Sequence, residues 1–271
     1  MRYFLLICRA VRLPTSSPKR SRLQYERLWH TAQTIKALVS AHAMLGNRSD
    51  LLAAATRAGD WWRAQKITSP PSIAGVVNST DVLPTRLGCI TDACDGVEDL
   101  SDVSDSAYGI FALAAVTGDS TYADTASSSA HWQLEHMAVP SEPGLFWNML
   151  NKSEGGRPLT GIAQPFRSQI EGSLFLQAYQ HTKDEALLAG FIAQADATVG
   201  FQDEYGLWML WTPNEISTGY LHPRYNLWYA FSLVDAYDAT HNASYLDAAV
   251  RTARFYATSV QQPDGTIWYK T

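Results

Sequence analysis

The sequence has few cysteines, no excess of positive charge and no long apolar run. It contains three Cys among 271 residues, and its formal net charge is −5. The negative charge argues against non-specific nucleic-acid binding. No apolar run approaches the roughly 18 residues of a membrane-spanning helix. Glycine and proline occur at ordinary levels, which excludes collagen-like and disordered chains. Neither a nucleic-acid nor a membrane partner is therefore predicted.

Several catalytic and cofactor motifs are absent as well. There is no glycine-rich phosphate loop, no closely spaced histidine pair and no cysteine-rich pattern, so neither a cofactor nor a metal is predicted. Without a Gly-x-Ser-x-Gly elbow, a serine hydrolase is not expected. What remains is a chain with 46% hydrophobic residues and 17% charged residues, with nine Trp, thirteen Tyr and nine Phe. Such a chain is globular and long enough to bury a core.

The first 22 residues are interpreted as a loose leader, followed by a single domain over 23–271. Residues 1–8 begin like a signal peptide, but the apolar stretch is short and Arg9 and Arg12 interrupt it. Cys89 and Cys94 could close a small loop disulfide. Four glycosylation sequons in expected turns or loops favour a secreted protein, at Asn47, Asn78, Asn151 and Asn242.

One pattern recurs four times along the chain. An apolar stretch runs into a short polar turn, which is followed by a second stretch with one apolar stripe at helical spacing. An inner helix covered by an outer helix satisfies both patterns, so each unit is predicted to be an αα-hairpin. The hairpins are expected at about 24–66, 103–138, 168–199 and 225–260, with turns at 45–48, 117–120, 182–185 and 240–243.

Concentric hairpins of this kind make an all-α fold, the α/α toroid. The turns within hairpins are short, whereas the connections between hairpins are long, and long loops in a compact domain are usually functional. All the long connections are expected at the end of the toroid where the inner helices begin. A complete toroid has six or seven hairpins, so four hairpins indicate either a truncated chain or an open toroid, and truncation is favoured.

The first turns of the inner helices supply the candidate catalytic groups. Asp105 and Glu171 lie at equivalent places on successive inner helices, and paired carboxylates in an aromatic cleft suit sugar chemistry. Each also suits a purely structural role, because Asp105 is a good N-cap and Glu171 complements the helix dipole. The fourth inner helix is predicted to begin at about Arg224 to Asn226, directly after His222 and Pro223.

Aromatic residues in the long connections are candidates for binding a sugar ring. Trp147, Trp208 and Trp211 have polar neighbours such as Asn148, and rigid rings beside hydrogen-bonding groups suit one face of a sugar. The alternative is that these rings pack against the toroid.

The chain resembles the six-hairpin glycosidase superfamily, and most of all its unsaturated glucuronyl and rhamnogalacturonyl hydrolases, over roughly residues 103–269. The resemblance rests on Ser104-Asp105-Ser106-Ala107, the turn Thr117-Gly118-Asp119-Ser120-Thr121-Tyr122, Ile170-Glu171-Gly172-Ser173-Leu174, Arg224-Tyr225-Asn226-Leu227-Trp228 and Pro263-Asp264-Gly265. The family normally has Asp where this chain has Glu171, and Gly-Gln where it has Tyr225 and Asn226. The resemblance implies an α/α toroid that acts on an anionic carbohydrate.

Three functions follow from these residues. In a hydrolase of uronic-acid-containing glycans, Glu171 would be the general acid/base, Asp105 would assist it, and Arg224 would bind the uronate carboxylate. In a polysaccharide lyase of the same fold, Tyr225 or His222 would remove the proton while Arg224 or Asn226 neutralises the carboxylate. The third possibility is an inactive, truncated toroid that binds glycans. The predicted substrate-binding set is Arg224, Asn226, Trp228, Trp147, Asn148, Trp208 and Trp211.

Overall fold

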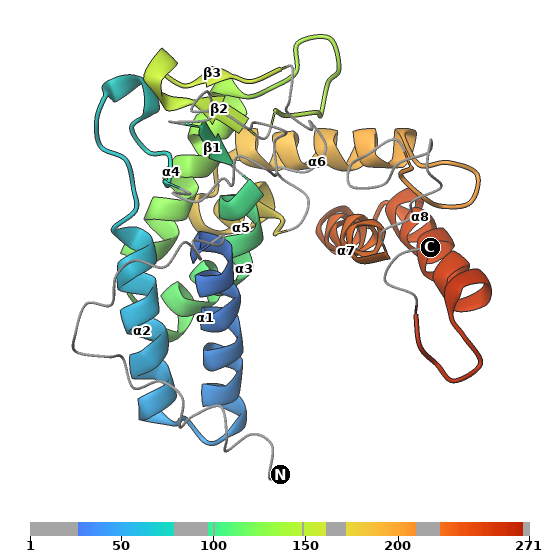
Figure 1. Ribbon diagram of the computed structural model, residues 1–271, viewed down its shortest axis with the longest axis horizontal. Helices are drawn as coiled ribbons and strands as arrows, with labels where there is room; N and C mark the ends of the chain where they lie inside the picture. The colour runs from blue at the N-terminus through green and yellow to red at the C-terminus, as the bar shows by residue number, and fades with distance from the viewer. Residues whose placement is uncertain are drawn as a thin grey trace, which may run out of the picture.

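The computed structural model describes residues 27–78, 97–99, 101–147, 149–160, 172–209 and 223–267. The predicted leader, Cys89 and Cys94 lie outside these ranges. Within them the chain forms four antiparallel helical hairpins (Figure 1). The hairpins are α1 (Arg27–Met44) with α2 (Ser49–Arg63), α3 (Ser101–Thr117) with α4 (Thr121–His136), α5 (Leu174–Thr182) with α6 (Glu185–Gly200), and α7 (Pro223–Thr240) with α8 (Ala243–Phe255). The four predicted hairpins and their turns are confirmed, but α5 begins at Leu174, six residues after the predicted start at about 168.

The helices form an inner and an outer layer. Helix α1 packs on α3 and α3 packs on α5, whereas the outer helices contact each other in the order α2, α4, α6 and α8. Helix α7 packs against α6 and α8. In Figure 1 the first hairpin lies on one side, the fourth on the other, and α3 to α6 lie between them. The all-α toroid architecture is therefore present in the described part of the chain.

The two layers reflect two sequence patterns. Inner helix α3 buries residues on all sides, because the consecutive residues 103–107 are all buried. Outer helix α8 instead buries a single stripe that includes Tyr245, Ala249 and Thr252, at the spacing of one helix face. The stripe continues into a π-helical segment, η7 (Tyr256–Val260), whose Tyr256 and Val260 are buried.

Three of the hairpin turns use the same hydrogen bonds. Between α3 and α4, the Thr117 hydroxyl donates to the Leu113 carbonyl (2.7 Å) and accepts from the Asp119 amide (3.3 Å). The Asp119 carboxylate accepts from the Thr121 amide at 3.0 Å. Gly118, between them, has φ +71°, a left-handed conformation that ends many helices. The same set recurs in Thr182-Lys183-Asp184 and Thr240-His241-Asn242.

Glycines let successive inner helices approach closely. A Cβ on Gly109 of α3 would lie 2.2 Å from the Ala32 carbonyl oxygen of α1. A Cβ on Gly172, just before α5, would lie 1.5 Å from the Ser104 carbonyl oxygen of α3. No side chain fits at either distance, so these contacts require glycine. They set the spacing of α1, α3 and α5.

The strands of the described residues are short and lie in the connections between hairpins. Strand β2 (Met149–Asn151) pairs antiparallel with β1 (Val97–Asp99) on one side and β3 (Arg157–Pro158) on the other. The 3-10 helices η2 (Pro71–Ile73) and η5 (Lys152–Glu154) lie in the same connections. Because β1 precedes α3 and β2 follows α4, the sheet joins two long connections at one end of the molecule.

Helix α7 begins at Pro223, one residue before the predicted start. Proline suits the first position of a helix because its fixed φ is helical and its missing N–H has no partner there in any case. None of the helices in the described ranges is long and apolar enough to cross a membrane.

Candidate functional site

Asp105 lies where the starts of three helices meet. Its side chain is 5% exposed, and its backbone carbonyl accepts a hydrogen bond from the Gln33 amide of α1 at 3.1 Å. The backbone of the preceding residue, Ser104, contacts Gly172, which follows Glu171 in the sequence. The predicted catalytic aspartate is thus packed against the segment that leads into α5.

One turn further along α3, a hydrogen-bond network links three inner helices. The Ser173 hydroxyl, at the start of α5, donates to Asp235 Oδ2 of α7 at 2.6 Å. The Tyr108 hydroxyl of α3 donates to the same oxygen and lies 3.2 Å from the Ser173 hydroxyl. The fourth inner helix contributes as well, because the Lys36 ammonium of α1 lies 4.7 Å from the centre of the Tyr108 ring. All four inner helices of the described chain therefore meet at Tyr108.

Burial keeps the Tyr108 hydroxyl protonated. It raises the pKa of the Tyr108 hydroxyl far above its usual value, and the negative charge of Asp235 raises it further. Tyr108 therefore remains a neutral donor at any ordinary pH. The neighbouring Phe231 of α7 is 52% exposed, and its ring lies 6.0 Å from the Tyr108 ring in an edge-to-face arrangement. An exposed aromatic surface thus borders the network.

A second cluster gathers aromatic rings at the starts of α1 and α7. The Trp228 ring lies 5.2 Å from Tyr225 and 6.3 Å from Trp29 of α1, each edge to face. His30 lies 4.2 Å from Trp29 and is exposed. Trp29 and Trp228 are half-buried, whereas Tyr225 is buried. The structure therefore brings the predicted Tyr225 and Trp228 together.

Trp29 and His30 were not predicted as site residues. They lie in the first turn of α1, whereas the sequence predicts candidate groups at the starts of the second, third and fourth inner helices. Their place at the start of the first inner helix is the signal that identifies them. Tyr108, Ser173 and Asp235 had no such signal, because they are far apart in the sequence.

The structure corrects two substrate-binding predictions, Trp208 and Asn226. Their exposed fractions are 1% and 0%. The Trp208 indole donates to the Thr198 carbonyl at 2.7 Å, and Asn226 Oδ1 accepts from the Trp208 amide at 2.9 Å. The Trp208 ring also packs 5.3 Å from Tyr229. Fully buried side chains do not contact a ligand, so these two residues attach the connection before α7 to the core.

The other predicted residues are only partly accounted for. Trp147 is half-buried and packs against the hydrophobic core, with its amide donating to the Met137 carbonyl at 2.8 Å. Arg224 lies in the first turn of α7, but its side chain falls outside the described part of the structure. Glu171, His222, Asn148 and Trp211 also lie outside the described residues.

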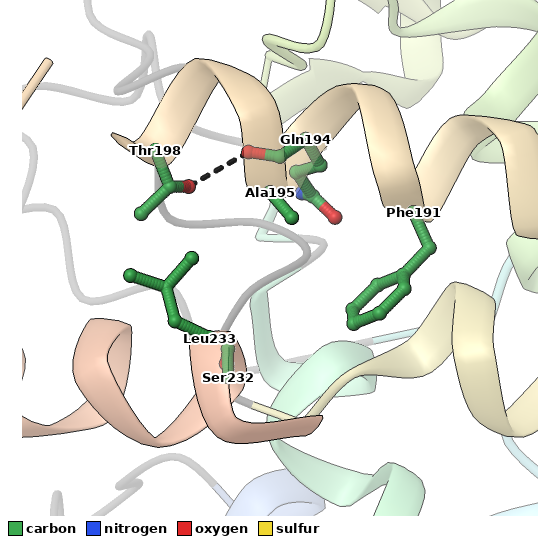
Figure 2. Close-up of a pocket in the computed structure, with 6 residues that line it drawn as sticks. All are labelled: Phe191, Gln194, Ala195, Thr198, Ser232 and Leu233. Carbon is green, nitrogen blue, oxygen red and sulfur yellow. Dashed lines mark hydrogen bonds between the residues drawn. The ribbon is translucent and has the colours of Figure 1, made fainter. Parts of the chain in front are cut away.

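A small cavity lies between α6 and α7 (Figure 2). Its volume is about 10 Å³, and it is lined by Phe191, Gln194, Ala195, Thr198, Ser232 and Leu233. A cavity of this size holds about one water molecule, whereas ligand pockets are on the order of 300 Å³ or more. It is therefore not a sugar site.

Comparison with known proteins identifies the fold. No protein-family model matches the sequence, and no curated protein matches it. Among solved structures, a cellobiose 2-epimerase from Bacillus thermoamylovorans matches with a TM-score of 0.70 and 12% identity, over 90% of this chain and 63% of that one. The chain therefore has the α/α toroid fold.

Two glycoside hydrolases give similar matches. A GH76 α-mannanase from Bacteroides thetaiotaomicron matches with a TM-score of 0.64 and 16% identity, over 89% of this chain and 60% of that one. A possible GH105 member from Klebsiella pneumoniae matches with a TM-score of 0.62 and 13% identity, over 87% and 59%. The chain spans about three-fifths of the length of these proteins. At such identities the likeness establishes the fold, as the sequence resemblance implied.

Proposed function

We propose that this chain is part of a carbohydrate-active enzyme, a glycoside hydrolase, with Asp105 and Glu171 as its pair of carboxyl groups. The observation that carries the proposal is the backbone contact between Ser104 and Gly172. Asp105 follows one of these residues and Glu171 precedes the other. Each acidic residue is therefore adjacent in sequence to one of two residues that are in contact. The fold is one that glycoside hydrolases share.

Glycoside hydrolysis requires two carboxyl groups with different protonation states. One donates a proton to the leaving oxygen, and the other stabilises the developing positive charge or activates water. In the proposal, Glu171 is the general acid/base and Asp105 provides the negative charge. The largely buried position of Asp105 limits competing contact with water, which strengthens its interaction with a positively charged transition state. The aromatic rings of Trp228 and Trp29 would contact the sugar ring of the substrate.

The finer part of the proposal is that the substrate contains a uronic acid held by Arg224. A guanidinium binds a carboxylate through two parallel hydrogen bonds, which lysine cannot reproduce. Arg224 occupies the first turn of α7, the same helix whose Trp228 contacts Trp29. Arg224→Lys should therefore lower the rate on uronate-containing substrates by roughly 30- to 1000-fold and affect neutral sugars less. Equal losses on both kinds of substrate would contradict this role.

The test is a screen of the chain against mannan, cellobiose, acidic polysaccharides and their unsaturated oligosaccharides. Hydrolysis would release reducing ends, and it would remove the absorbance of an unsaturated uronate. A gain of that absorbance would instead indicate elimination and would contradict the hydrolase, as would epimerisation detected by NMR. With a substrate in hand, Asp105→Asn and Glu171→Gln should each lower the rate by about 10²- to 10⁴-fold.

Asp60→Asn is the matched control, because Asp60 lies on outer helix α2 and bonds to Tyr122. It should leave the rate unchanged. Full activity in both Asp105→Asn and Glu171→Gln, or no turnover of any carbohydrate by the unmodified chain, would overturn the proposed function.

A further inference from the structure

The Asp235 carboxylate joins two helix starts that belong to the proposed site. Its Oδ2 accepts hydrogen bonds from Ser173 at the start of α5 and from Tyr108 of α3. We propose that Asp235 is a positioning residue, which fixes the starts of α3 and α5 against each other and so sets the position of Asp105. This inference rests on the proposed function for its catalytic consequence, but its structural part is independent of it.

The backbone of Ser173 is the first line of support. Ser173 has φ +49° and ψ +43°, a left-handed conformation that residues with a side chain rarely adopt. It is fully buried, and its hydroxyl donates to Asp235 at 2.6 Å. A charge-assisted hydrogen bond of this length compensates for the unfavourable backbone. The conformation of Ser173 also directs the chain at Gly172, which contacts Ser104. Asp235 therefore acts on the contact between α3 and α5.

Tyr108 provides the second connection. It follows Asp105 by three residues, so the two side chains project from the same face of α3, one turn apart. A hydrogen bond from the Tyr108 hydroxyl to Asp235 resists rotation of α3 about its axis. Edge-to-face contact with Phe231 and the Lys36 ammonium near its ring further confine Tyr108. The direction in which Asp105 points is thereby tied to α7.

Two tyrosine–aspartate hydrogen bonds between outer helices serve as controls that separate a positioning role from a purely stabilising one. The Tyr122 hydroxyl donates to Asp60 at 2.8 Å, and the Tyr245 hydroxyl donates to Asp196 at 2.6 Å. Each of these bonds joins two outer helices, as the Tyr108 bond joins two inner helices. Neither involves Ser173 or a residue of the α3 start. Loss of an outer bond should affect stability and leave catalysis unchanged.

The experiment measures kcat and KM for the full chain and for Asp235→Ala, Asp235→Asn and Ser173→Ala, with Asp60→Ala as the control. Asp235→Ala should lower kcat roughly 100-fold with little change in KM, because small displacements of a catalytic group have effects of that size. Asp235→Asn should retain most of kcat, since its amide oxygen still accepts both hydrogen bonds. Ser173→Ala should lower kcat less than Asp235→Ala, and it serves as the second variant where Asp235→Ala folds poorly.

Amide hydrogen exchange gives a readout that does not require activity. In Asp235→Ala, exchange should rise together over residues 103–109 and 173–178, whereas Asp60→Ala should leave both segments unchanged. Unchanged exchange in both segments would overturn the inference. So would equal kcat losses in Asp235→Asn and Asp235→Ala, which would indicate that the charge matters instead of the position. Raised exchange in a chain that turns over no carbohydrate would support the positioning and refute only the proposed function.

Discussion

The outer and inner layers of the toroid use the same tyrosine–aspartate hydrogen bond in different ways. In the outer layer, Tyr122 and Tyr245 each follow the left-handed residue of their turn by four positions and bind an aspartate of the preceding outer helix. In the inner layer, Tyr108 shares its acceptor with Ser173, which has a left-handed backbone although it lies outside the hairpin turns. The outer bonds repeat with the hairpins, whereas the inner network occurs once among the described residues.

This difference separates architecture from a specific site. A bond that recurs at equivalent positions stabilises the repeating unit and needs no other explanation. A bond that occurs once, and that includes an unfavourable backbone conformation, indicates a requirement of one place in the molecule. The following predictions either break the inner network or compare it with its outer counterparts.

The largest effect is expected from Gly172→Ala. The added Cβ would lie 1.5 Å from the Ser104 carbonyl oxygen, so α3 and α5 must move apart. The free energy of unfolding should fall by at least about 3 kcal/mol, the upper part of the range for overpacking. Gly118→Ala is the control, because a Cβ there meets nothing within 4 Å and only the φ of +71° is unfavourable. It should cost about 1 kcal/mol. Equal losses in urea-induced unfolding would contradict a close contact at Gly172.

Removal of the tyrosine hydroxyls should have the next largest effect. Tyr108→Phe leaves the half-buried Asp235 with one donor fewer, and should cost about 2 to 3 kcal/mol. Tyr122→Phe and Tyr245→Phe should each cost about 1 kcal/mol, because water reaches their partners more easily; the Asp60 side chain, for example, is 51% exposed. Thermal and urea unfolding of the three variants measure the difference. A Tyr108→Phe variant as stable as the outer variants would show that the inner network contributes no special stability.

The fold could be predicted from the sequence because its signals are local. Each turn contains its own capping chemistry, as in Thr117, Gly118 and Asp119, and each helix has an apolar pattern that distinguishes the inner from the outer layer. These features operate over a few residues, so the hairpin boundaries follow from short stretches of sequence.

The candidate site could be predicted only in part, for the opposite reason. Asp105, Tyr225 and Trp228 are candidates because inner-helix starts are recognisable in the sequence, and their roles stay predictions. The partners of Asp235 lie 62 and 127 residues away, and no local pattern connects them. The predictions for Trp208 and Asn226 assume that the long connection and the start of the following helix face solvent, whereas both residues are buried and hydrogen-bonded to each other. Side-chain pairing between distant segments is the information that the sequence pattern lacks.

The buried tyrosines should ionise at different alkaline pH values. Burial, followed by the neighbouring aspartate, raises the pKa of Tyr122 and Tyr245 to about 12, whereas tyrosine in the unfolded chain ionises near pH 10. The unfolded state therefore loses these protons first. The stability that they contribute is complete below about pH 10 and is lost as the pH rises from 10 to 12.

Tyr108 should ionise later still, because burial and Asp235 raise its pKa further. Tyrosinate absorbance of the native chain, compared with that of Tyr108→Phe, measures this order. Unfolding curves between pH 8 and 12 should decline less steeply for Tyr122→Phe and Tyr245→Phe than for the unmodified chain. Ionisation of Tyr108 at or below the pH at which Tyr122 ionises would show that desolvation and Asp235 do not raise the pKa of Tyr108 above that of Tyr122.

The smallest change in stability is expected at Gln194, a polar side chain between the inner helix α7 and the outer helix α6. Its side chain is 3% exposed and points into the cavity between α6 and α7 (Figure 2). Neither end of its amide has a hydrogen-bond partner in the described part of the chain. An amide offers about four hydrogen-bonding positions, and the one water molecule that fits the cavity meets fewer than these.

Gln194→Met should therefore stabilise the chain by about 1 kcal/mol, because an apolar side chain of similar length removes the unmet hydrogen-bonding groups and fills the same space. Gln194→Ala should destabilise the chain instead, by enlarging the cavity. Urea unfolding of both variants tests the opposite signs. A destabilising Gln194→Met would mean that the amide is well satisfied, and that the cavity water makes more hydrogen bonds than its size suggests.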